Sequence, residues 1–243
     1  MKFIEKLQNK MRDNFSGEGL SIAFFGDSVT QGCFEIYRKN DGAIETVFDP
    51  MHAYHKHLSK IFSVLFPSVP VNIINAGISG DHTAHACERL ERDVLRHEPD
   101  LVVVCFGLND ACNGEDKLAD YQKNLHTILK TILERGLEVI FLTPNKMNTG
   151  LSCHLKNDQE REIAEQTMRI QKDGVMDLYM EGARQVCAEL RVPVCDCYRK
   201  WKRLSQCGID TTELLANKIN HPSRDMNWLF AFSLAEAIFG LEA

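Results

Sequence analysis

Three short polar segments and one late histidine carry most of the side chains that could do chemistry. The segments are the Gly-Asp-Ser turn at 26–28, the glycine-containing stretch at 75–81 and the Gly-Leu-Asn-Asp turn at 107–110. The histidine is His221, in Asn-His-Pro at 220–222. A serine hydroxyl is a poor nucleophile near neutral pH and needs an imidazole to take its proton, so these residue types suit nucleophilic catalysis.

Each polar segment also has an ordinary structural interpretation. Gly, Asp and Ser are common turn residues. Asn109 could bind the backbone of its own loop, and Gly80 could mark a position with positive φ. Residue types alone therefore leave the choice between a site and a set of turns open.

The elements that must position these segments alternate between strand and helix. Short apolar runs rich in β-formers predict strands at 21–25, 71–75, 101–106, 138–143 and 192–195. Helical patterns occur at 51–65, 83–96 and 118–135, within 158–190, and at 224–239. This alternation predicts an α/β protein, a three-layer α/β/α sandwich around a five-stranded parallel sheet with flavodoxin-like topology.

The order of strands and polar segments favours a shared site. Each of the three segments directly follows one of the first three predicted strands, and His221 precedes the last predicted helix. In an open parallel sheet, ligands bind beyond the carboxyl ends of the strands. We therefore expect the segments to meet at one edge, which independent turns need not do.

Composition places the chain among ordinary globular proteins. Apolar residues make up 44% of the sequence and charged residues 26%. We expect one domain over 1–243, with 1–19 forming a surface helix and a lead-in to the first strand. The net charge of -6 gives no reason to expect nucleic acid or an anionic membrane as partner. The N-terminus resembles no secretory signal, so we expect a cytoplasmic protein.

The cysteines and histidines do not predict a metal site. The nine cysteines are odd in number and form no paired framework, so reduced thiols are expected. Cys195 and Cys197 have no second Cys/His pair of matching spacing that would complete a ligand set. His82 and His85 could form a metal pair with Asp81, but a solvated first helical turn is favoured because the ligand set is incomplete.

Further polar residues near the predicted edge have positional interpretations. Segment 31–50 is long for a connection between strand and helix, so we expect it to be functional or to have its own structure, and to shape a substrate pocket. Asn145 and Asn148 follow the fourth predicted strand and are expected near the pocket. Asp27 and Asp110 are expected to brace their own loops.

Over nearly its whole length the chain resembles the SGNH hydrolases, also called GDSL-type lipases and esterases. The Gly-Asp-Ser turn matches the family's first block and implies that Ser28 is the nucleophile and, through its N–H, an oxyanion donor. The next two blocks imply donors from the Gly80 backbone and the Asn109 side chain, and His-Pro at 221–222 implies His221 as general base. Such donors stabilise the charge of the tetrahedral intermediate.

The resemblance implies an esterase without metal or cofactor. The expected substrates are small soluble carboxylic esters, with O-acetyl groups on carbohydrates as the leading class. No nucleic acid or membrane is expected as partner, and the sequence does not specify an oligomeric state.

The sequence departs from the family where the last block usually places an aspartate, three residues before the histidine. Lys218 occupies that position and cannot accept a hydrogen bond from the His221 ring. We predict a Ser-His dyad with backbone or asparagine support. The groups that could orient the ring are a backbone carbonyl, water or one of four side chains, Asn217, Asn220, Asp210 and Glu213.

Two other functions compete with an esterase. The first is a catalytically degenerate carbohydrate-binding or scaffolding module of the same fold, supported mainly by Lys218. The second is a nucleotide-binding flavodoxin-like domain, suggested by the glycines of 75–81. It lacks both the phosphate-binding Gly-x-x-x-x-Gly-Lys pattern and the dinucleotide fingerprint after the first strand.

Overall fold

Five parallel strands form the central sheet of a computed structural model that describes residues 1–241. They are β1 (Leu20–Gly26), β4 (Val71–Gly77), β5 (Leu101–Cys105), β6 (Glu138–Leu142) and β7 (Val194–Cys195). Their order is β4-β1-β5-β6-β7. Numbered as consecutive strands of this sheet, this is the flavodoxin-like order 2-1-3-4-5. The five predicted strands and their topology are confirmed.

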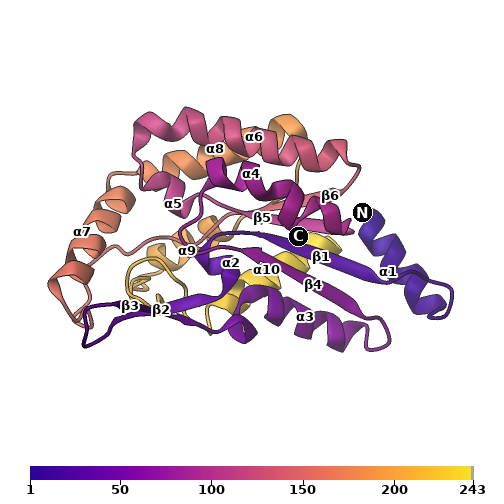
Figure 1. The fold of residues 1–243 in the computed structure, drawn as a ribbon, viewed down its shortest axis with the longest axis horizontal. Coiled ribbons are helices and arrows are strands. Elements are labelled where there is room, and N and C mark those ends of the chain that lie inside the picture. The colour runs from indigo at the N-terminus through magenta and orange to yellow at the C-terminus, as the bar shows by residue number, and fades with distance from the viewer. Residues whose placement is uncertain (242–243) are drawn as a thin grey trace.

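Helices cover both faces of the sheet, as its almost wholly apolar central strands require. Figure 1 shows α4 (Thr83–Asp93), α6 (Leu118–Glu134) and α8 (Val175–Leu190) on one face, and α3 (Tyr54–Leu65) and α10 (Asn227–Phe239) on the other. The predicted three-layer sandwich is therefore confirmed. The remaining helices within the layers are α2 (Ser28–Gln31), α5 (Leu108–Ala111) and α9 (Cys197–Gln206), and short 3-10 turns span Pro50–His52, Leu95–His97 and Glu115–Lys117.

One predicted helical stretch is divided. The pattern within 158–190 forms two helices, α7 (Asp158–Lys172) and α8. Gly174, between them, has φ 83°, a left-handed conformation that an α-helix does not contain. The break turns the chain, so that α7 lies beside the carboxyl-end edge of the sheet while α8 packs on α6 (Figure 1).

Segment 31–50 has its own structure, as expected from its length. It forms an antiparallel hairpin of β2 (Cys33–Arg38) and β3 (Ile44–Phe48), separate from the main sheet. Figure 1 places this hairpin beyond the carboxyl ends of the parallel strands. The hairpin therefore lies next to the sheet edge at which the polar segments are found.

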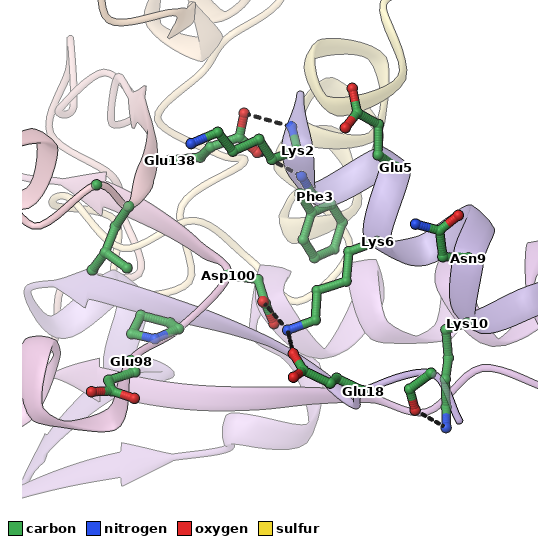
Figure 2. A pocket seen from close by; sticks show the side chains of 14 residues that line it. Lys2, Phe3, Glu5, Lys6, Asn9, Lys10, Glu18, Glu98, Asp100 and Glu138 are labelled. Carbon is green, nitrogen blue, oxygen red and sulfur yellow. Dashed lines mark hydrogen bonds and ion pairs between the residues drawn. The ribbon is translucent and has the colours of Figure 1, made fainter. Parts of the chain in front are cut away.

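The N-terminal helix α1 (Lys2–Arg12) closes the opposite end of the sheet. Figure 2 shows its contacts: both carboxylate oxygens of Glu138 accept backbone N–H groups, from Lys2 at 2.9 Å and Phe3 at 2.7 Å. Lys6 Nζ lies 2.7 Å from Asp100 and 3.1 Å from Glu18. These groups surround a cavity of about 650 Å³. Within residues 1–241, no helix combines the length and apolar character needed to span a bilayer.

Candidate active site

Ser28 occupies the first position of α2, directly beyond the end of β1. The Asp27 side chain caps this short helix by accepting the backbone N–H of Val29 at 3.0 Å. Gly26 is required next to it, because a Cβ there would overlap the Thr30 side chain. The turn thus fixes the backbone of Ser28, and its side chain faces a cavity of about 340 Å³.

The structure brings Ser28 and His221 together from opposite ends of the chain. His221 Nε2 lies 2.9 Å from Ser28 Oγ, and Nδ1 lies 3.0 Å from the carbonyl oxygen of Phe34. A carbonyl can only accept, so Nδ1 carries the proton and Nε2 is the nitrogen that accepts from the serine hydroxyl. Burial lowers the pKa of His221 to about 4, partly opposed by the bond to Phe34. The ring is therefore neutral at neutral pH, as a general base must be.

A β-bulge explains why the carbonyl of Phe34 is free for this bond. On β2, Cys33 pairs with Phe48 and Ile36 pairs with Thr46, so three steps along β2 oppose two along β3. The extra residue of a bulge leaves the ladder and changes the direction of its peptide groups. Sequence reasoning allowed for a backbone carbonyl but did not locate it, and the length of segment 31–50 was the available signal.

Asn217 and Asn220 support the backbone around His221 rather than its ring. Asn217 Oδ1 accepts backbone N–H groups from Ile219, Asn220 and His221 at 2.9–3.0 Å. Asn220 Oδ1 accepts from Asn217 Nδ2 at 2.9 Å. Lys218 adopts φ 58° at the centre of this turn. The two asparagines thus fix the loop that carries the imidazole.

The two candidate carboxylates have other partners. Asp210 accepts the backbone N–H of Thr212 at 2.9 Å. Glu213 pairs with Lys218 Nζ at 2.9 Å and accepts from Ser152 Oγ at 2.9 Å. Lys218, at the family's aspartate position, thus pairs with Glu213, and the imidazole bonds to a backbone carbonyl instead.

The three expected oxyanion donors face one cavity. Ser28, Gly80 and Asn109 all line it, together with His221. Gly80 has φ 78°, a conformation that glycine adopts without strain. Asn109 Nδ2 donates to the carbonyl of Asp81 at 2.8 Å, which fixes the amide while its second N–H remains for a ligand. The arrangement offers two backbone donors and one side-chain donor beside the Ser-His pair.

Two buried carboxyl groups, Asp27 and Asp110, are the sequence neighbours of Ser28 and Asn109. Burial raises the pKa of Asp27 to about 7, with Asp110 and Asp81 adding like charge, and burial also raises the pKa of Asp110. Asp110 accepts from both the N–H and the hydroxyl of Thr83, so it links to α4 rather than bracing only its own loop. Among the described residues, Oδ2 of Asp27 and Oδ2 of Asp110 have no hydrogen-bond partner.

Arg89 is a buried charge that sequence reasoning missed. Its guanidinium pairs with Asp81 and donates to the carbonyls of Ala76 at 2.7 Å and Gly26 at 3.0 Å. It thereby connects the ends of β4 and β1 to the loop that carries Gly80. Its spacing of three from Ala86 on a helical pattern was a signal that it faces inward.

The histidines beside the oxyanion loop have structural partners. His82 caps α4, and His85 Nδ1 lies 2.8 Å from Asp81 Oδ1. His85 is half exposed, in line with a solvated helical turn. Over residues 1–241 no group of three or more His, Cys, Asp or Glu side chains is arranged to hold a metal ion.

The hairpin and the loop before α7 form the walls of the cavity. Tyr37 on β2 meets Lys156, whose Nζ lies 4.1 Å from the ring centre. Asn145 and Asn148, expected near the pocket by position, are fully buried and do not line it. Asn145 instead donates to the carbonyl of Asn220 at 2.8 Å, so it supports the loop of the candidate base.

Family comparison agrees with this geometry. The family model described as "GDSL-like Lipase/Acylhydrolase family" matches residues 24–229. The chain belongs to this family. The match includes every element that contributes to the Ser-His pair and its oxyanion donors.

Similar curated proteins include esterases. An acetylxylan esterase from Geobacillus stearothermophilus is 25% identical over 137 residues, which cover 53% of this chain and 61% of the relative. The chain thus spans less than two thirds of the length of the curated relatives that it matches.

Solved structures of GDSL-like proteins share the fold. A catalytic mutant of an acetylxylan esterase, also from Geobacillus stearothermophilus, superposes with a TM-score of 0.67 at 18% identity, covering 91% of this chain and 94% of the other. A lipase/acylhydrolase from Enterococcus faecalis gives a TM-score of 0.64 at 24% identity, covering 91% and 96%. At these identities the likeness concerns the fold.

Proposed function

We propose that the protein is a serine esterase that hydrolyses small soluble carboxylic esters, with O-acetyl groups on carbohydrates as the leading substrates. The observation that carries the proposal is the 2.9 Å contact between His221 Nε2 and Ser28 Oγ, with Nδ1 held by the carbonyl of Phe34. A degenerate binding module would have no need to keep this pair aligned beside three oxyanion donors.

The proposed reaction proceeds in two steps. Ser28 Oγ attacks the ester carbonyl while His221 Nε2 takes its proton, and the negative oxygen is held by the N–H groups of Ser28, Gly80 and Asn109. His221 then returns the proton to the leaving alcohol, which leaves an acyl group on Ser28. Water, deprotonated by the same imidazole, releases the acid and restores the serine.

The substrate class rests on the cavity and on the relatives. A volume of about 340 Å³ exceeds what an acetyl group fills and leaves room for part of the alcohol. Tyr37, Glu35 and Glu160 line it with aromatic and carboxylate groups that can contact a sugar. The acetylxylan esterase among the relatives acts on such an ester by its name. Among the similar solved structures, two forms of an acetylxylan esterase with alanine for a serine or a histidine are described as catalytic mutants.

A side-by-side assay tests the proposal. Wild type, Ser28→Ala and Ser63→Ala are compared on p-nitrophenyl acetate, p-nitrophenyl butyrate and acetylated xylo-oligosaccharides, with and without chelator. Ser63 lies on the exposed side of α3 and is the matched control. We expect turnover to fall by about 10⁴-fold or more in Ser28→Ala only, and to be unchanged by chelator.

Other outcomes would point elsewhere. Equal rates for wild type and Ser28→Ala on every ester would contradict the esterase and favour the binding module. Activity on p-nitrophenyl acetate without release of acetate from the sugars would retain the esterase and reject the carbohydrate substrate.

A further inference from the structure

One guanidinium joins the loop of the candidate base to the hairpin that orients it. Arg224, three residues after His221, donates Nη1 and Nη2 to the two oxygens of Glu35 at 2.6 and 3.2 Å. Its Nε donates to Asp49 Oδ2 at 2.7 Å. Glu35 is on β2 and Asp49 directly follows β3, so the arginine binds to both strands of the hairpin.

The same guanidinium also contacts the residue whose carbonyl holds the imidazole. Arg224 Cζ lies 4.4 Å from the centre of the Phe34 ring. The peptide group between Phe34 and Glu35 thus has Arg224 contacts on both sides, through the ring of one residue and the carboxylate of the next. Because this peptide belongs to the β-bulge, the strand ladder does not hold its carbonyl in place.

The group formed by Arg224, Glu35 and Asp49 differs from an ordinary surface ion pair. Arg224, Glu35 and Asp49 are only 24–32% exposed, and the bond to Glu35 is bidentate. Exposed pairs contribute little to stability, whereas forked and partly buried networks fix geometry. Two histidines adjoin this group: His52 binds Asp49 at 2.9 Å, and His57 Nε2 lies 3.4 Å from the carbonyl of Arg224.

We propose that Arg224 is a positioning residue that holds the carbonyl of Phe34 against His221 Nδ1. This carbonyl takes the place of the side-chain carboxylate that is missing at position 218. The inference rests on the proposed esterase function. In a Ser-His-Asp triad, the acid fixes the tautomer and orientation of the imidazole. Here a backbone carbonyl performs that task, and the arginine keeps the carbonyl in place.

The test compares Arg224→Gln, Arg224→Lys and the control Arg135→Gln. Arg135 forms an ion pair of similar length with Glu91, at 2.6 Å, but on the exposed surface away from the cavity. Three quantities are measured at about pH 8, where histidine protonation contributes little. They are kcat and KM on p-nitrophenyl acetate, and the proton resonance of His221 Nδ1–H by NMR, assigned by its absence in His221→Gln.

We expect Arg224→Gln to lower kcat about 100-fold with KM changed less than about threefold, because a small displacement of the base has an effect of that order. The Nδ1–H resonance should broaden or vanish through exchange with water, while the backbone amide spectrum stays folded. Arg224→Lys should lose about tenfold, because an ammonium cannot reproduce the fork. Arg135→Gln should change none of the three quantities.

Two results would overturn the inference. The first is an unchanged Nδ1–H resonance and kcat in Arg224→Gln, even if its melting temperature falls. The second is a loss in Arg224→Lys as large as in Arg224→Gln together with an unfolded amide spectrum in both, which would make the arginine a stability element only. Absence of Ser28-dependent turnover in the wild type would reject the proposed function separately, since the resonance still reports whether Arg224 holds the ring.

Discussion

The two ends of the sheet each carry a cavity and a group of charged residues. They differ in whether the polar atoms of those residues have hydrogen-bond partners. At the amino end, Lys6 meets two carboxylates, and both oxygens of Glu138 accept N–H groups from α1 (Figure 2). At the carboxyl end, Asp27 and Asp110 each keep one buried oxygen without a partner among the described residues. His221 is buried there as a neutral ring.

This difference identifies the functional end better than size does. The amino-end cavity measures about 650 Å³ and the carboxyl-end cavity about 340 Å³. Buried polar groups without partners lower the stability of the fold, so they concentrate where another requirement keeps them. The larger cavity is a junction between α1 and the sheet, and the smaller one is lined by the paired Ser28 and His221, the latter with its pKa lowered by burial.

Replacing one asparagine at each end should give the largest difference in activity between the two ends. Asn109→Ala removes a side-chain donor beside Ser28 and should lower kcat on p-nitrophenyl acetate about 10²–10³-fold, with little change in KM. Asn9 lines the amino-end cavity, and Asn9→Ala should leave kcat unchanged. A loss below about tenfold in Asn109→Ala would remove this amide from the proposed oxyanion hole.

The pH dependence of activity should reflect the burial of His221. The pKa of this ring is lowered to about 4, and only the neutral ring can accept a proton. kcat/KM should therefore stay level above that pH and fall about tenfold per unit below it. Rates measured between about pH 3 and pH 8, with preincubation to detect inactivation, check this. A midpoint near the ordinary histidine value of about 6.5 would show that the ring is solvated or paired with a carboxylate.

Stability should respond to pH through Asp27. Its pKa is raised from 3.8 to about 7, so the folded state binds more protons between these values and its stability falls as pH rises through them. Asp27→Asn removes this dependence. The stability of the variant relative to wild type should increase by on the order of 2 kcal/mol from about pH 5 to pH 7, measured by denaturant unfolding. A gap that does not change with pH would show that the carboxyl group stays ionised.

The smallest effect is expected at the amino end. Glu138→Gln weakens the cap on α1 and should lower the free energy of unfolding by about 1 kcal/mol without changing kcat. The control Glu134→Gln, which removes an exposed pair with Lys130 at 3.9 Å, should change neither. A fall in kcat for Glu138→Gln would contradict the purely structural role of this end.

The sheet could be predicted because its signals are local. Five apolar runs ended by turn residues gave the strands, and their alternation with helices gave the topology. The polar segments at 26–28 and 107–110 then fell at one edge by the geometry of parallel strands. The division between α7 and α8 was missed because Gly174 is one residue within a long helical pattern.

The orientation of His221 could not be predicted, for a different physical reason. A carbonyl is present in every residue, so no residue type marks Phe34 as the acceptor. Its availability depends on the bulge in the hairpin, and the bulge depends on how β2 and β3 pair. Asn217, Asn220, Asp210 and Glu213 were reasonable candidates by proximity in sequence. The two asparagines bind within the turn around Lys218, Glu213 pairs with Lys218, and Asp210 accepts from Thr212.

The use of a backbone carbonyl as acceptor also determines which mutations the site tolerates. A triad aspartate is lost through a single codon change, whereas a peptide carbonyl survives any side-chain replacement that leaves the hairpin intact. Insertion or deletion of one residue in β2 or β3 would shift the bulge and turn the carbonyl away from His221. The acceptor is therefore encoded by the length and register of the hairpin rather than by the type of one residue.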